Sequence, residues 1–149
     1  MLGKFCAVIV VVGMASAGSA LADWEYARWG MTESEVIAAS RGLAKPNPTV
    51  YDDSTDDGSS RGLLFAPYTA GKFSFRAVFK FDRSDRLRRV NLRLEGGQCD
   101  ALQAELVGRY GGSARPGFMM RWRDTASRNY VAFIQLADDY CAVEYWELD

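Results

Sequence analysis

The stretch that decides the fold is FSFRAVFKFDRSDRLRRVNLRL, residues 73–94. Its first half has Phe or Ala at every second position from Phe73 to Phe81, and its second half places Val90, Leu92 and Leu94 in the same way. Alternation with a period of two is typical of a strand with one buried face. Because the polar run at residues 82–86 supplies a turn between the halves, the stretch predicts an antiparallel hairpin.

Two helices are predicted on either side of this hairpin. Thr32 and Glu35 have the spacing of a capping box, which predicts a short helix over residues 33–41 that Gly42 ends. Asp100 is the expected N-cap of a second helix, with Gln103 in the reciprocal position and a stop at residues 111–112. Each helix is expected to place one apolar stripe against the sheet.

Further strands are predicted at residues 63–68, 118–123, 130–136 and 141–148. The expected fold class is therefore α+β, an antiparallel sheet of about six strands with two short helices packed on one face. The order of a helix followed by three strands occurs twice, which is the pattern of a tandem αβββ repeat. Low identity between the halves leaves duplication and coincidence both open.

The first 22 residues have the three parts of a secretory signal peptide. Lys4 is followed by a short apolar stretch and by a small-residue segment that ends at Ala22. The apolar stretch is too short to span a bilayer comfortably, so a transmembrane protein is not expected. We expect cleavage near Ala22, a single domain at residues 23–149, and a soluble protein in the periplasm or outside the cell.

Removal of that leader changes the count of cysteines. Cys6 lies within the leader, so the mature chain has Cys99 and Cys141. In an oxidising compartment an even pair most simply forms a disulfide. A reactive or redox-active thiol is the alternative, but neither a C-x-x-C spacing nor a histidine partner supports it.

The segment Trp-Gly-Met-Thr-x-x-Glu-Val, residues 29–36, precedes the first predicted helix. Together with the order of elements, it resembles small envelope proteins of the SmpA/OmlA type and the β-lactamase-inhibitor-protein fold. This resemblance implies a non-enzymatic protein that works through protein–protein contacts. The chain lacks the cysteine that the lipoprotein type has at its cleavage site, so the resemblance does not extend to a membrane anchor.

Four basic residues, Arg76, Lys80, Arg89 and Arg93, are expected on the outer face of the predicted hairpin. Neighbouring strands would place them close together. One interpretation is a charged sheet face that prevents edge aggregation. The other is an anion-binding patch for phospholipid headgroups, lipopolysaccharide phosphates or an acidic protein partner.

Aromatic residues are the second group of candidate binding residues. Trp24, Trp29 and Trp146 are the interface candidates, because tryptophan is common at protein interfaces. Tryptophan also fills hydrophobic cores, and the sequence alone does not assign each ring to one role.

Several function classes are disfavoured by composition. The chain has no histidine and a formal net charge of −1, which disfavours imidazole catalysis, histidine-ligated zinc and nucleic-acid binding. The acidic run from Asp53 begins like a calcium loop, but Leu64 stands where the twelfth-position glutamate belongs. We therefore expect no metal, no cofactor and no catalytic residue.

The sequence thus predicts an exported, non-enzymatic module that binds another envelope or extracellular protein. Two alternatives remain open. One is a carboxylate-dependent hydrolase of wall or polysaccharide, and the other is a protein that binds anionic lipid or glycolipid.

Overall fold

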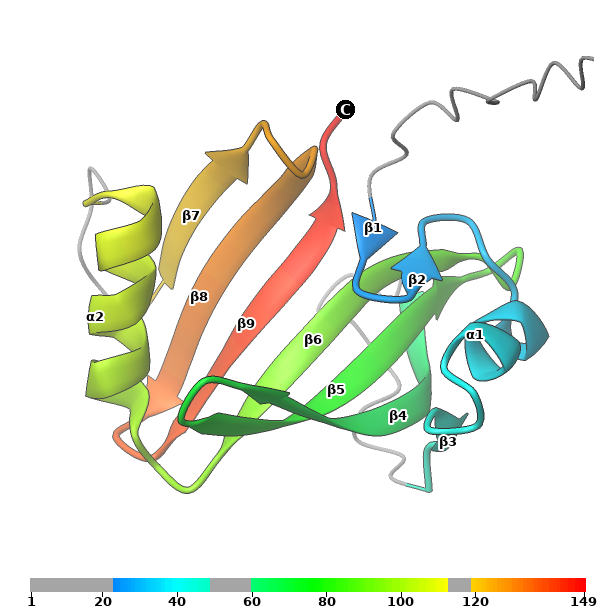
Figure 1. Ribbon diagram of the computed structural model, residues 1–149, viewed down its shortest axis with the longest axis horizontal. Helices are drawn as coiled ribbons and strands as arrows, with labels where there is room; N and C mark the ends of the chain where they lie inside the picture. The colour runs from blue at the N-terminus through cyan, green and yellow to red at the C-terminus, as the bar shows by residue number, and fades with distance from the viewer. Residues whose placement is uncertain (1–22, 49–59, 113–118) are drawn as a thin grey trace, which may run out of the picture.

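The computed structural model describes residues 23–48, 60–112 and 119–149. The predicted leader at residues 1–22 and the acidic run from Asp53 lie outside these residues. Within them the chain forms a mixed α+β domain with two helices, a sheet of seven antiparallel strands and a separate pair of short strands (Figure 1).

The elements follow one another along the chain in a simple order. They are β1 (Asp23–Trp24), β2 (Ala27–Arg28), α1 (Glu33–Ala39), β3 (Lys45–Pro46), β4 (Ser60–Ala70), β5 (Phe73–Asp82), β6 (Leu87–Glu95), α2 (Cys99–Tyr110), β7 (Met119–Asp124), β8 (Asn129–Ala137) and β9 (Tyr140–Glu147). The strand order in the large sheet is β3-β4-β5-β6-β9-β8-β7, and β1 pairs with β2.

The predicted hairpin is confirmed as β5 and β6. Phe79 lies opposite Val90 and Ala77 lies opposite Leu92, as the alternation requires. Phe79 and Phe81 have no exposed surface, because their side chains face the hydrophobic core. The hairpin therefore occupies the middle of the fold, with β4 on one side and β9 on the other.

Both helices contribute side chains to one hydrophobic core, which lies on the first face of the sheet. Val36 from α1, and Leu102 and Leu106 from α2, join Phe79 and Phe133 in the same buried cluster. Figure 1 shows α1 beside the β4 end of the sheet and α2 beside its β7 end. We call the opposite side of the sheet the second face. No helix among the described residues is both long and apolar enough to cross a membrane.

The long strands of the sheet follow the same order outward from its centre on both sides. One row of paired residues crosses six strands on the second face. From β4 to β7 the row reads Phe65, Val78, Asn91, Glu144, Ala132 and Arg121. Strands β6 and β9 pair at the centre of this row. Outward from the Asn91–Glu144 pair, the row crosses β5 and then β4 on one side, and β8 and then β7 on the other.

Two expectations about local structure need correction. The large sheet has seven strands rather than about six. The additional strand is β3, which could not be predicted because two residues are too few to show an alternation. Helix α2 begins at Cys99 after Gln98, whose side chain makes no capping bond, so Asp100 is not the N-cap. Asp100 lies instead in the first turn, where a negative charge favours the helix dipole.

The first helix begins as predicted and ends two residues earlier. The backbone N–H of Thr32 donates to Glu35 Oε2 at 2.7 Å, and the Glu35 N–H donates to Thr32 Oγ1 at 3.4 Å. This reciprocal pair confirms the capping box. The helix ends at Ala39, with Ser40 as its C-cap, and Gly42 adopts the expected positive φ of 81°.

Candidate functional site

Cys99 and Cys141 form a disulfide, as the sequence predicts, with their Cα atoms 5.9 Å apart. The bond links the first turn of α2 to strand β9. Both residues are only 1% exposed, so neither sulfur is accessible to a substrate at the surface. The pair therefore holds the helix on the sheet rather than forming part of a binding site.

The four predicted basic residues do share the second face of the sheet. Lys80 lies opposite Arg89, and Arg76 lies opposite Arg93, in the β5–β6 pairing. Their proximity follows directly from the alternation in the sequence. The groups that these four side chains contact cannot be predicted from the alternation, because those groups lie on other strands and segments.

A buried carboxylate, Glu144 on β9, pairs with the two central cations. Lys80 Nζ lies 3.5 Å from Glu144 Oε1, and Arg89 Nη1 lies 3.4 Å from Glu144 Oε2. The side chains of Lys80 and Glu144 are 11% and 9% exposed. Because an internal anion already occupies this position, Lys80 is not placed to bind an external one.

The other two residues of the group, Arg76 and Arg93, also contact side chains of the same protein. Arg76 Nη2 donates to Asn47 Oδ1 at 2.8 Å, and its guanidinium lies 3.9 Å from the centre of the Phe65 ring. The guanidinium of Arg93 lies 6.0 Å from the centre of the Tyr140 ring. Arg76 and Arg93 thus make contacts within the second face of the sheet, and these contacts do not decide between the two interpretations of the sequence.

The interpretation of Trp24 as an interface residue is wrong. Its side chain is 5% exposed and packs edge-on against Phe79, with ring centres 5.6 Å apart. The short β1–β2 pair brings it into the core. Trp29 and Trp146 are partly exposed, so both remain available for binding.

Trp146 belongs to a row of stacked side chains that crosses four strands on the second face. In register order the row is Arg89, Trp146, Tyr130 and Arg123. The Trp146 and Tyr130 rings stack with centres 5.3 Å apart and an angle of 20° between their planes. The guanidinium of Arg89 lies 5.6 Å from the Trp146 ring centre, and that of Arg123 lies 5.5 Å from the Tyr130 ring centre. We call this group the arginine–aromatic row.

A shallow hollow of about 400 Å³ lies along this row, and we call it the row hollow. Its lining residues are Arg121, Trp122, Arg123, Tyr130, Trp146 and Asp149. Arg121 and Arg123 are exposed, and no ion pair joins either to a carboxylate in the described parts of the chain. Sequence reasoning missed both arginines, although their alternation with Met120 and Trp122 indicates that they share one strand face.

A second hollow of about 290 Å³ lies at the end of the sheet, and we call it the end hollow. Its lining residues are Trp29, Ser60, Asp82, Arg88, Arg89, Trp146, Glu147 and Asp149. Trp146 therefore borders both hollows. Trp29 reaches the end hollow because Gly30 N–H donates to Leu87 O at 2.9 Å and Leu87 N–H donates to Met31 O at 2.8 Å.

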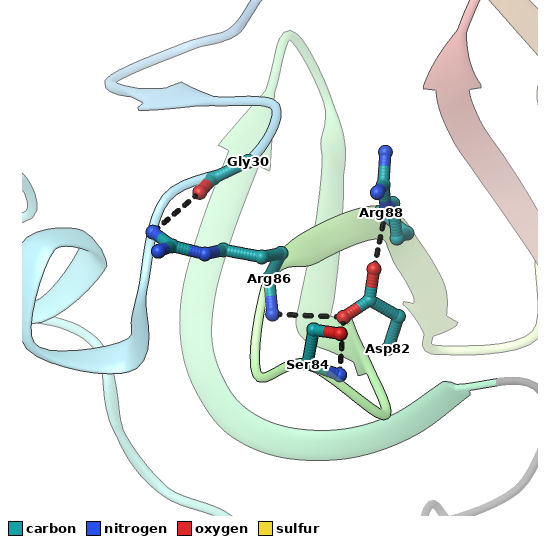
Figure 2. A network of polar contacts seen from close by, with 5 residues as sticks. All are labelled: Gly30, Asp82, Ser84, Arg86 and Arg88. Carbon is teal, nitrogen blue, oxygen red and sulfur yellow. Dashed lines mark hydrogen bonds and ion pairs between the residues drawn. The ribbon is translucent and has the colours of Figure 1, made fainter.

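Asp82 organises one wall of the end hollow (Figure 2). Its Oδ1 accepts the backbone N–H groups of Ser84 and Arg86 at 2.8 and 3.1 Å, and its Oδ2 accepts Arg88 Nε at 2.6 Å. The hydrogen bond from Arg88 is the main cause that lowers the pKa of the Asp82 carboxyl below its usual value. Asp82 is therefore ionised at neutral pH and holds the Arg88 side chain in place.

The Asp82 contacts predict a pH-dependent difference in stability between wild type and Asp82→Asn. Because the pKa of Asp82 is lower in the folded state, its ionised form stabilises the fold above pH 3.8, and this contribution is lost as pH falls through the folded-state pKa. We expect Asp82→Asn to be less stable at pH 7 by at most about 1 kcal/mol, since Arg88 is largely exposed. Urea denaturation over a pH series measures this. A stability difference that stays constant down to pH 2 would contradict the assignment.

The ionised state of Asp82 also bears on hydrolysis. A glycosidase needs one carboxyl group with a raised pKa as its general acid. Asp82, the most firmly held carboxylate of the end hollow, has its pKa shifted in the opposite direction. Asp82 therefore does not have the raised pKa that a general acid needs. No group of three or more metal-binding side chains occurs in the described part of the chain.

No protein-family model matches the chain, and no curated protein or solved structure matches it either. The resemblance to small envelope proteins thus remains an expectation from the sequence. The two hollows and the row between them are the features from which a function can be inferred.

Proposed function

We propose that this protein is an exported, non-enzymatic binding module that takes an acidic segment of another envelope or extracellular protein on its arginine–aromatic row. The observation that supports the proposal most strongly is the stack of Arg89, Trp146, Tyr130 and Arg123 on the second face. Arginine, tryptophan and tyrosine are the residue types that contribute most binding energy at protein interfaces.

The stack is suited to binding because its side chains already support one another. Trp146 has Tyr130 against one side and the guanidinium of Arg89 near its ring, and Arg123 lies against Tyr130. A side chain that is held before binding loses less conformational entropy when a partner arrives. The row therefore offers a rigid surface to a partner.

The charges of the row hollow favour an acidic partner. Arg121 and Arg123 contribute two guanidinium groups, and Asp149 is the one carboxylate among its lining residues. Guanidinium groups can only donate hydrogen bonds, and carboxylates can only accept them. An Asp or Glu side chain of a partner can thus pair with Arg121 or Arg123 while an apolar neighbour packs against the aromatic edges.

Export is supported by two features of the chain. The pattern of residues 1–22 is that of a secretory signal peptide with cleavage near Ala22. The Cys99–Cys141 disulfide is of a kind that persists in oxidising compartments. A partner that is itself in the periplasm or outside the cell follows from this location.

The repeated order of elements supports the further proposal that the domain is a tandem αβββ repeat. Helix α1 precedes the long strands β4, β5 and β6, with the two-residue strand β3 between them, and helix α2 precedes β7, β8 and β9. The two sets of strands meet at the central Asn91–Glu144 pair. Such a duplicated scaffold agrees with the resemblance to small envelope proteins that act through protein–protein contacts.

Binding of a labelled acidic peptide tests the proposed function. The probe is a fluorescein-labelled peptide of alternating glutamate and tyrosine, and a lysine–tyrosine peptide is the control ligand. We expect saturable binding of the acidic peptide that weakens as salt screens the charges. The double variant Arg121→Glu, Arg123→Glu should bind at least about tenfold more weakly, because like charges would then face each other.

A matched variant distinguishes the loss of the arginines at the row hollow from a general change in net charge. Arg41 and Arg83 are exposed and line neither hollow, so Arg41→Glu with Arg83→Glu changes the net charge equally. This variant should retain binding of the acidic peptide. Equal weakening in both double variants, or binding of anionic lipid vesicles without binding of the peptide, would contradict the proposal.

A further inference from the structure

We propose that the end hollow is a second binding site, and that it takes a neutral sugar residue, free or as the terminal unit of a glycan. The site is separate from the protein-binding surface proposed above, although Trp146 borders both. Three kinds of side chain meet there: a fixed guanidinium, a fixed indole ring, and carboxylates on the rim.

Arg88 is the fixed guanidinium. Its Nε donates to Asp82 Oδ2, which is itself held by the backbone N–H groups of Ser84 and Arg86. Figure 2 shows the Arg88 side chain extending away from the turn beyond Asp82. Because Asp82 engages the Nε atom, the two terminal nitrogens of Arg88 are left to donate to a pair of neighbouring oxygens. A vicinal diol of a sugar ring presents such a pair.

Trp29 is the fixed indole ring. Its Nε1 donates to Asn129 Oδ1 at 2.9 Å, and Asn129 Nδ2 donates to the backbone carbonyl of Asp23 at 2.9 Å. Asn129 is 3% exposed, so the polar edge of the indole is anchored in the protein interior while the ring remains partly exposed. A partly exposed, anchored aromatic ring offers an apolar surface for the C–H groups of a sugar.

The charges of the end hollow favour a neutral ligand. Arg88 and Arg89 line this hollow together with three carboxylates, Asp82, Glu147 and Asp149. Asp82 is already paired with Arg88, and Arg89 is paired with Glu144 outside the hollow. A free anion would meet Glu147 and Asp149, and a free cation would meet the two arginines. A ligand with hydroxyl groups, which both donate and accept, can bond to each kind of group.

Ser60 provides an independent indication that the site lacks a partner. The residue is 3% exposed and lines the end hollow, and its hydroxyl has no hydrogen-bond partner among the residues that the structure describes. Buried hydroxyl groups without a partner are uncommon and cost free energy. The volume of about 290 Å³ is at the small end of ligand sites, which is suitable for one sugar ring.

Titration with simple sugars tests the proposal. The probes are glucose, galactose, mannose and N-acetylglucosamine, with glucose 6-phosphate and glucuronate as anionic comparisons. We expect at least one neutral sugar to bind with a dissociation constant in the millimolar range and to shift the indole N–H signal of Trp29 in a nuclear magnetic resonance spectrum. The anionic comparisons should bind more weakly.

Arg88→Lys and Trp29→Phe are the informative variants. Arg88→Lys retains the charge and loses the paired nitrogens, so we expect at least about fivefold weaker sugar binding. Arg83→Lys, at an exposed turn position outside the hollow, should bind like the wild type. Both Arg88→Lys and Trp29→Phe should still bind the acidic peptide, which keeps this proposal distinct from the first.

Three results would overturn the sugar site. They are no saturable shift with any neutral sugar, tighter binding of the anionic sugars than of the neutral ones, and wild-type sugar affinity in both Arg88→Lys and Trp29→Phe. Circular dichroism of each variant verifies that it is folded before its binding is compared.

Discussion

Replacing Glu144 with alanine is expected to lower the free energy of unfolding by about 3–5 kcal/mol, the range for removal of one partner from a buried ion pair. Glu144 is the carboxylate that pairs with both Lys80 and Arg89. Without it the Lys80 ammonium, whose side chain is 11% exposed, would remain in a poorly hydrated position. Guanidinium denaturation of the wild type and the variant measures the change.

A double variant shows whether the unpaired charge is the cause. Glu144→Leu alone should be strongly destabilising, whereas Glu144→Leu combined with Lys80→Met removes both buried charges. We expect the double variant to be more stable than Glu144→Leu, because Arg89 is more exposed than Lys80 and can reach water. If the effects of the two substitutions on the free energy of unfolding are additive, the unpaired Lys80 charge is not the cause of the destabilisation.

Replacing Cys99 and Cys141 together with alanine is expected to cost about 4 kcal/mol, the value that loop-closure entropy gives for their separation of 42 residues. For a domain of this size, the melting temperature should fall by roughly 10–20 °C. The physical reason is that the bond restricts the unfolded chain between α2 and β9. Calorimetry of the wild type and the double variant measures the shift.

Reduction gives a control for the disulfide experiment. Wild-type protein unfolded in the presence of a thiol reductant should approach the stability of the double variant, because both lack the same bond. The variant itself should not respond to the reductant. A loss below about 1 kcal/mol would show that the disulfide does not limit the unfolded chain as the entropy model requires.

The hairpin could be predicted from the sequence because its signal is local. Phe79 and Val90 are eleven residues apart, and the alternation on each strand already defines which side is buried. The capping box of Thr32 and Glu35 is equally local. Residue pattern and simple stereochemistry were sufficient for these two features, whereas the N-cap of α2, which is also local, was predicted wrongly at Asp100.

The partner of Lys80 could not be predicted, because it depends on strand order. Glu144 is 64 residues away from Lys80, and β6, α2, β7 and β8 lie between them in the chain. Nothing in the pattern of β9 specifies that it pairs with β6 rather than with the edge of the sheet. The prediction of a basic face therefore did not include Glu144, the carboxylate that pairs with Lys80 and Arg89.

The same limit applies to the candidate site. Arg123 and Tyr130 become neighbours through the β7–β8 pairing, and Trp146 joins them through the β8–β9 pairing. Trp24 could not be assigned to the core from the sequence, because it lies in a two-residue strand, which is too short to show a period. Tryptophan in such a segment suits core and surface equally well, so only the packing of the chain decides.

The most direct test of the central claim uses the indole N–H signals of the four tryptophans during titration with the acidic peptide. The Trp146 signal should move saturably with peptide concentration, while those of Trp24 and Trp29 stay in place. In the Arg121→Glu, Arg123→Glu variant the Trp146 shift should be lost. Binding without movement of Trp146, or movement of Trp29 in its place, would contradict the assignment of the arginine–aromatic row as the surface that binds a protein partner.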